Sequence, residues 1–199
     1  DGLSTVNALL LSGVNTTQGK ELDIIKLAFN YDKYANISVP IKKFFNQSTL
    51  ISYCPYCNLE DVKVIPIDEQ NNATGHHLDH FFSQKDFPLL SYSLFNLVPS
   101  GYTCNVLNKG QILFTDDLHM NPHLSGFGDN IRFVPIKTGL EVTGINIKFN
   151  CDPGSKKIKQ LIGNLKDIDE LHDKGNINVF KLKSKYSDHE HIDLANSIL

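Results

Sequence analysis

Between His76 and Gly110 the chain reads HHLDHFF (76–82), then LFNLVPS (94–100), then CNVLNKG (104–110). Each cluster places polar residues among apolar ones. A strand that served only a core would not set Asp79 and His80 together beside two phenylalanines. Burying a carboxylate and an imidazole costs several kcal/mol unless they are paired, hydrogen-bonded or bound to metal. We therefore expect the chemistry of this chain to lie in these clusters.

The residue types in the clusters suit phosphodiester hydrolysis. Asp79 is a hard oxygen ligand for Mg²⁺ or Mn²⁺, and the carboxamide of Asn105 is a second one. Side chains alternate along a strand, so His80 should point away from Asp79 and is expected to take a proton from the attacking water. A base in such a position contributes about 10²- to 10⁴-fold to the rate.

The three clusters resemble, in order and spacing, the signature of the HNH endonuclease family, whose fold is a β-hairpin followed by a helix around one divalent ion. The resemblance implies that His80 activates water and that Asp79 and Asn105 hold the ion. It also implies that Asn96 fixes the hairpin loop and so orients His80. Many members carry His where this chain has Asn105. Lys109 is expected either to reach a phosphate or to cap the helix C-terminus.

A Cys-x-x-Cys knuckle, Cys54 to Cys57, precedes the clusters. Related HNH proteins pair such a knuckle with a second one, and four thiolates hold a structural Zn²⁺. Here the second pair reads Gly101-Tyr102-Thr103-Cys104, so one ligand is missing. Cys54, Cys57 and Cys104 could bind zinc with a fourth ligand from His76, His77 or Cys151, or the site could be degenerate. Cys151 also reads as a small buried hydrophobe on a strand.

The whole chain, 1–199, is expected to form one α+β domain with a ββα-metal core at 54–115. Residues 20–50 read as a helical segment, and 116–199 as a C-terminal α/β extension. We expect a strand at 62–67 followed by a polar turn at 68–72. In the extension we expect a hairpin over 131–149 turning at Thr138-Gly139, a helix from Ser155 through Lys166, and a short ordered segment at 179–186.

Composition excludes a disordered chain, since 41% of the residues are hydrophobic and 21% charged. No apolar run approaches the roughly 20 residues that span a bilayer, and we read no export signal, which favours the cytoplasm and a metal knuckle over disulfides. The net charge of −3 gives no general affinity for nucleic acid. Positive charge is local: Lys156, Lys157, Lys159 and Lys166 form a run without acids.

A looser resemblance links Asn121-Pro122-His123 and the segment 126–133 to HNH proteins of bacterial anti-phage systems, including those paired with an ATPase (Septu-like and some retron effectors). It implies DNA as the substrate and a regulatory partner that supplies DNA affinity. Two alternatives stay open. One is a nuclease-like module without activity that binds nucleic acid or a protein. The other is a zinc-knuckle scaffold that meets no nucleic acid.

Overall fold

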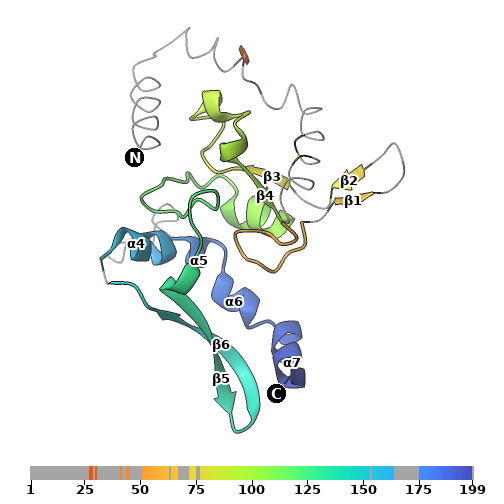
Figure 1. The fold of residues 1–199 in the computed structure, drawn as a ribbon, viewed down its shortest axis with the longest axis vertical. Helices are drawn as coiled ribbons and strands as arrows, with labels where there is room; N and C mark the ends of the chain where they lie inside the picture. Colours follow the sequence, from red (N-terminus) through yellow and green to blue (C-terminus); the bar gives the residue numbers. More distant parts are fainter. Residues whose placement is uncertain are drawn as a thin grey trace.

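The computed structural model describes residues 27, 28, 30, 41, 44, 51–62, 64–66, 72–74, 77–152, 154–163 and 175–198. They form a mixed α+β structure of three separate two-stranded antiparallel sheets with short helices, which agrees with the α+β part of the predicted fold class (Figure 1). The predicted helical segment 20–50 lies outside the described residues, apart from five positions. Within the described part, no helix has the length and apolarity that crossing a bilayer needs.

The centre of the molecule is a hairpin followed by a helix. Strand β3 (His77–His80) pairs antiparallel with β4 (Leu97–Ser100), with Asp79 opposite Val98 and His80 opposite Leu97. The connection carries two 3₁₀ turns, η2 (Pro88–Leu90) and η3 (Leu94–Asn96). Directly after β4 comes the π-helix η4 (Thr103–Lys109), which ends with Gly110 N–H donating to the carbonyl of Asn105. Helices of this type are rare in proteins, and those that occur often lie at functional sites.

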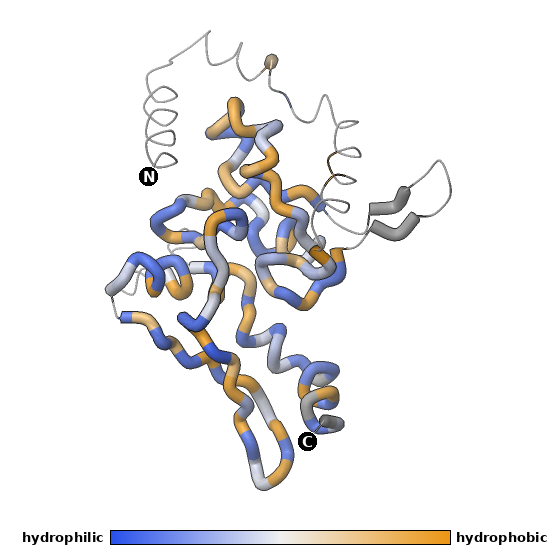
Figure 2. The backbone as a smooth tube through the Cα atoms, in the orientation of Figure 1, coloured by the Kyte–Doolittle hydropathy of each residue, from blue (hydrophilic) through white to orange (hydrophobic). Residues whose placement is uncertain are grey.

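Two more hairpins flank this centre. The predicted strand at 62–67 is observed as β1 (Val64–Pro66), and it pairs with β2 (Asn72–Thr74), which the sequence did not predict. The predicted hairpin over 131–149 is confirmed as β5 (Ile131–Thr138) and β6 (Glu141–Phe149). Gly139 turns it with φ of 65°, a conformation that residues with a Cβ adopt at a cost. Hydrophobic and hydrophilic residues alternate along this hairpin (Figure 2).

The predicted helix through Lys166 is too long. Helix α4 (Lys156–Ile162) begins as expected at Ser155, whose hydroxyl accepts a bond from the Ile158 N–H. It ends before Gly163, which adopts φ of 88°. Gly175 packs so closely against this end that a Cβ there would lie 2.5 Å from the Gly163 nitrogen. The helix therefore ends at Ile162, where the chain turns at Gly163 and Gly175 packs closely against it.

The end of the chain is more helical than expected. The ordered segment predicted at 179–186 is observed as α5 (Asn176–Val179) and α6 (Leu182–Tyr186), and α7 (His189–Ile198) follows them. Helix α7 is tied to β6 by the side chain of Asn196, which accepts from the Val142 N–H and donates to the Val142 carbonyl.

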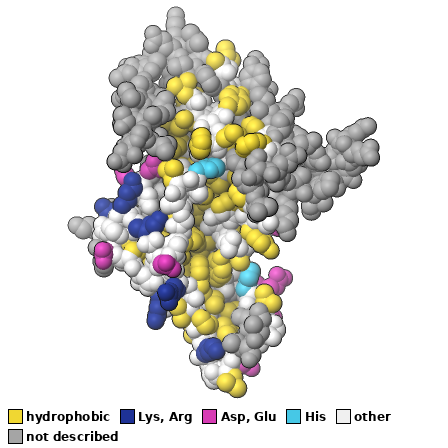
Figure 3. All heavy atoms as spheres, viewed as in Figure 1, with side chains coloured by type: hydrophobic (Ala, Val, Ile, Leu, Met, Phe, Trp, Pro, Cys, Tyr) yellow, Lys and Arg dark blue, Asp and Glu magenta, His cyan; other side chains and the backbone are white. Residues whose placement is uncertain are grey.

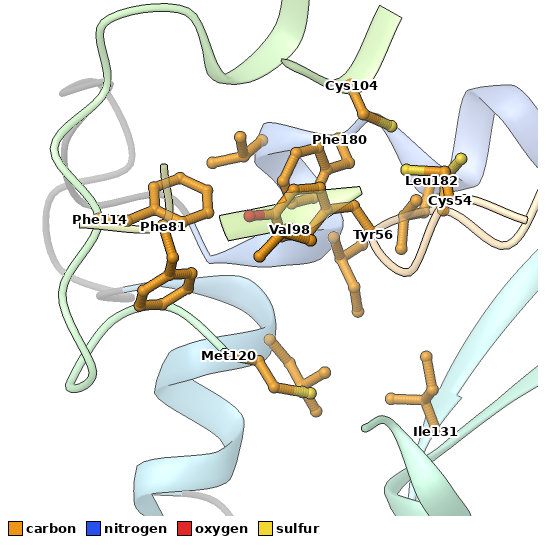
Figure 4. Close-up of a cluster of buried hydrophobic side chains, with 14 of the residues drawn as sticks. Cys54, Tyr56, Phe81, Val98, Cys104, Phe114, Met120, Ile131, Phe180 and Leu182 are labelled. Atoms are coloured by element: carbon orange, nitrogen blue, oxygen red, sulfur yellow. The ribbon is translucent and has the colours of Figure 1, made fainter. Parts of the chain in front are cut away.

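One buried cluster joins the knuckle, the central hairpin and the C-terminal helices. Its aromatic part consists of Tyr56, Phe81, Phe114 and Phe180, with the ring of Tyr56 stacked on that of Phe180 at 4.4 Å between centroids. Figure 4 shows Cys54 and Cys104 at one side of these rings. Hydrophobic side chains also reach the surface on the face in Figure 3, and Lys and Arg gather on the side where Figure 1 places α4.

Candidate active site and cysteine cluster

Asp79 is a buried carboxylate with a partner on each oxygen. The Tyr56 hydroxyl donates to Oδ2 at 2.5 Å, and the Lys109 ammonium lies 2.7 Å from Oδ1. Only 4% of the Asp79 side chain is exposed. Burial, with the nearby negative charge of Asp79, raises the pKa of Tyr56 well above its usual value. Tyr56 therefore keeps its proton and remains a donor to the carboxylate at any physiological pH.

Lys109 reaches across from the last turn of η4 to β3. Besides Asp79, its ammonium donates to the carbonyl of His80 at 2.6 Å, and it lies 4.9 Å from the centre of the Phe114 ring. The side chain is 5% exposed. Neither sequence expectation for Lys109, a phosphate contact or a helix cap, describes these contacts: its charge is directed at the carboxylate of the neighbouring strand.

His80 ends β3 and is half-buried. Its Nε2 lies 3.0 Å from the carbonyl of Ser91, in the connection between the strands. A carbonyl oxygen only accepts, so this bond requires the proton on Nε2. In the neutral ring the lone pair is then on Nδ1, the arrangement of a base whose second nitrogen is held in place.

Asn96 lies in η3, directly before β4, and is 2% exposed. Its Oδ1 accepts the N–H of Phe82 at 2.7 Å, and its Nδ2 donates to the carbonyls of Phe82 and Leu90. These bonds join both ends of the segment that follows His80 and that contains Ser91. The side chain thus ties Phe82 to Leu90, the residue before Ser91.

Asp79, His80, Asn105 and Lys109 line one cavity of about 240 Å³. The hairpin supplies the first two residues and η4 supplies the others, so the turn between β4 and η4 brings Asn105 to face β3. Ser83, Gln84 and Lys85 line the same cavity from the loop after His80. One cavity therefore brings together a carboxylate, an imidazole, a carboxamide and an ammonium.

Cys54, Cys57 and Cys104 form a second site. All three are buried, and their sulfur atoms lie within 4.8 Å of one another. None of the four cysteines, all of which are described, forms a disulfide. Such a group could hold a metal ion such as zinc, since thiolates are its preferred ligands. The predicted gathering of these three cysteines is confirmed.

The backbone of the knuckle favours a thiolate at Cys57. Asn58 adopts φ of 55°, which turns the chain so that the N–H groups of Leu59 and Glu60 point at the Cys57 sulfur. Hydrogen bonds from Cys104 and Cys54, together with these amides, lower the pKa of Cys57. Hydrogen bonds to Cys54 and Cys57, followed by burial, raise the pKa of Cys104.

Two of the fourth ligands expected from the sequence, His77 and Cys151, do not join this group. His77 is exposed, and its ring lies 5.5 Å from that of Tyr102. Cys151 follows β6 and is outside the group, while His76 lies outside the described residues. Instead, Glu60 and Lys185 lie next to the sulfurs: the Lys185 ammonium is 2.6 Å from Glu60 Oε1 and 3.1 Å from Cys104 Sγ.

Burial by itself would lower the pKa of Lys185, but its bonds to Glu60 and Cys104 outweigh this effect and raise the pKa. The ammonium is therefore charged in the folded protein. Sequence reasoning missed Lys185, because nothing in its spacing links it to a knuckle far away in the chain. It also missed Tyr56, which lies between Cys54 and Cys57 in the sequence and whose ring is buried with them.

Comparison of this chain with family models, curated proteins and solved structures gives no significant match.

Proposed function

We propose that this protein is a metal-dependent endonuclease of the HNH type, with His80 as general base and with Asp79 and Asn105 as ligands of Mg²⁺ or Mn²⁺. The observation that carries the proposal is the shared cavity: the side chains of Asp79, His80 and Asn105 line it together, and Ser91 holds the proton of His80 on Nε2. The order of two antiparallel strands and a helix supports the ββα-metal core that the resemblance implies.

The residues in the cavity fit a hard divalent cation. Carboxylate and carboxamide oxygens are the donors that Mg²⁺ and Mn²⁺ prefer. A divalent ion would take the place beside Asp79 Oδ1 that the ammonium of Lys109 holds at 2.7 Å. A bound ion would stabilise the charge that develops on the phosphate and on the leaving oxygen.

The chain's own groups then have distinct tasks. The Nδ1 lone pair of His80 accepts a proton from the attacking water, while Ser91 holds the ring by its other nitrogen. Asn96 fixes the backbone that carries this carbonyl. Tyr56 orients Asp79 through its hydrogen bond to Oδ2. DNA is the proposed substrate, and a partner protein in anti-phage defence is the proposed setting, in which the partner offsets the net charge of −3.

The decisive experiment is cleavage of supercoiled plasmid by the purified protein with Mg²⁺, with Mn²⁺ and with EDTA. We expect metal-dependent cleavage that His80→Ala abolishes while its circular dichroism spectrum stays native. His77→Ala is the matched control, because it changes an exposed histidine on the same strand and should cleave like wild type. Cleavage retained in His80→Ala, or independent of divalent metal, would contradict the assignment.

One observation favours a second candidate, a nuclease-like module that binds nucleic acid or protein without turnover. Both oxygens of Asp79 are engaged by protein groups, Tyr56 and Lys109. A carboxylate with both oxygens held by protein groups also fits a purely structural role. This candidate predicts binding to single- or double-stranded DNA or RNA with no cleavage in either metal, and no dependence of binding on His80.

A further inference from the structure

The place of the missing fourth cysteine is filled by another side chain. A Cβ built on Gly101 would lie 2.6 Å from Cδ and 2.7 Å from Cβ of Glu60, and its nearest neighbour of all would be Oε2 of the same residue. No side chain fits at position 101 while Glu60 holds this position. The glycine and the glutamate are therefore complementary: Glu60 occupies the space that a side chain at 101 would need.

We propose that Glu60 is the fourth ligand of a Zn²⁺ ion bound by Cys54, Cys57 and Cys104, and that Lys185 neutralises part of its charge. This proposal does not depend on nuclease activity. It makes the knuckle a complete four-ligand site, built from three thiolates and one carboxylate.

The distances between donor atoms fit a tetrahedral ion. With Zn–S near 2.3 Å and Zn–O near 2.1 Å, the sulfur–oxygen edge of a tetrahedron is about 3.6 Å. The observed separation of Cys57 Sγ and Glu60 Oε1 is 3.8 Å. The three sulfurs lie within 4.8 Å of one another, and the sulfur–sulfur edge would be about 3.8 Å. Glu60 lies outside the group whose ligand atoms are all within 4.8 Å of one another, so its carboxylate must move toward the sulfurs to complete the set.

The surroundings of Glu60 already hold its carboxylate beside the sulfurs. Its Oε2 accepts the N–H of Thr103 at 2.9 Å, so the start of η4 orients it. Structural zinc sites are closed by four protein ligands, and this carboxylate lies 3.8 Å from one of the three sulfurs, that of Cys57.

Lys185 neutralises part of the negative charge that the four ligands carry. Three thiolates and a carboxylate carry more negative charge than one Zn²⁺ cancels, and a buried excess of charge is costly. The ammonium contacts both Glu60 and Cys104, and it is buried with them at 17% exposure. Bonds of this kind to metal ligands typically change metal affinity by about 10- to 100-fold.

The test compares zinc binding of wild type with that of three variants of the full chain. Wild type should carry one zinc per chain. Glu60→Gln should lower the apparent zinc affinity, measured by competition with a chromophoric chelator, by at least about 10- to 100-fold. His76→Ala is the control for the fourth ligand expected from the sequence, and it should bind zinc like wild type.

The third variant, Glu60→Gly with Gly101→Cys, replaces both residues and gives a four-cysteine site without the steric conflict. In the Co²⁺-substituted protein, its sulfur-to-metal charge-transfer absorption should exceed that of wild type by about a third, as four thiolates replace three. Zinc affinity should return toward the wild-type value or exceed it. The comparison of affinities requires that Glu60→Gln folds. The double variant Glu60→Gly/Gly101→Cys supplies a readout that does not depend on the folding of Glu60→Gln.

The proposal is overturned if Glu60→Gln binds zinc as tightly as wild type with an unchanged Co²⁺ spectrum. It is overturned equally if His76→Ala, rather than Glu60→Gln, weakens binding, because His76 is then the fourth ligand. A purified wild-type protein that takes up no zinc would also overturn it, and each of these outcomes is read from zinc binding rather than from cleavage of DNA.

Discussion

The hydroxyl of Tyr56 donates to Asp79 across 2.5 Å, so the residue between the two knuckle cysteines holds the carboxylate of the cavity. The cysteine cluster and the proposed active site are therefore not independent. The ring of Tyr56 stacks on Phe180 and meets Phe114 edge to face, which leaves its hydroxyl one position. Any change that opens the knuckle should move Tyr56 and with it Asp79.

The raised pKa of Tyr56 gives a prediction for stability at alkaline pH. The folded protein binds this proton more tightly than the unfolded chain, whose tyrosine titrates near pH 10. Above that pH, unfolding releases the proton and the free energy of unfolding falls as pH rises. The fall should be up to about 1.4 kcal/mol per pH unit steeper in wild type than in Tyr56→Phe.

This difference is measured by urea titrations from pH 7 to 11 on both proteins. Tyr186, whose pKa burial also raises, contributes equally to both and cancels. At neutral pH, Tyr56→Phe should lose about 1.5 to 3 kcal/mol, the usual contribution of a hydrogen bond to a charged group. Parallel stability curves above pH 10 would show that Tyr56 does not titrate differently in the two states.

Asn96→Ala should lower both stability and turnover. The substitution leaves the N–H and carbonyl of Phe82 and the carbonyl of Leu90 without their partner, in a buried place. We expect a loss of about 2 to 4 kcal/mol in the free energy of unfolding, since each unsatisfied buried group costs about 1 to 3 kcal/mol. The maximal cleavage rate should fall more than the affinity for DNA, because the loop that positions His80 is loosened.

The matched control for Asn96 is Asn146→Ala on β6, which removes an exposed asparagine. Its free energy of unfolding should stay within about 0.5 kcal/mol of wild type. If both variants lose the same stability, the contacts of Asn96 are not what fixes the loop.

Lys109→Met separates the structural role of Asp79 from its proposed role as a metal ligand. Removing the ammonium leaves a buried carboxylate with Tyr56 as its remaining hydrogen-bond donor, and breaking such a pair typically costs about 3 to 5 kcal/mol. Mg²⁺ or Mn²⁺ should restore part of this loss by binding Asp79. At a concentration of 100 times its Kd, the gain would be about 2.7 kcal/mol.

Thermal denaturation of Lys109→Met with and without Mn²⁺ measures this effect. The double variant Asp79→Asn/Lys109→Met lacks the carboxylate and should gain nothing from the metal. Equal stabilisation of the two variants by Mn²⁺ would place the ion elsewhere.

Local patterns in the sequence predicted the pieces that depend on neighbours along the chain. Alternation predicted the hairpin of β5 and β6, and Ser155 correctly marked the start of α4. The spacing of Cys54, Cys57 and Cys104 predicted that their sulfurs would gather. In each case the determining interaction is either a backbone bond within a few residues or a ligand spacing with few geometric solutions.

What the sequence did not contain is the set of contacts between distant segments. The end of α4 was missed because Gly175 packs against it, and the fourth ligands proposed were wrong for His77 and Cys151 because neither approaches the sulfurs. The sequence by itself indicated the polar clusters between His76 and Gly110 and the cysteines of the knuckle. Only the tertiary structure decided that Lys109 and Tyr56 share Asp79, and that Glu60 fills the space at Gly101. Side-chain partners at long range follow from packing, which no local periodicity records.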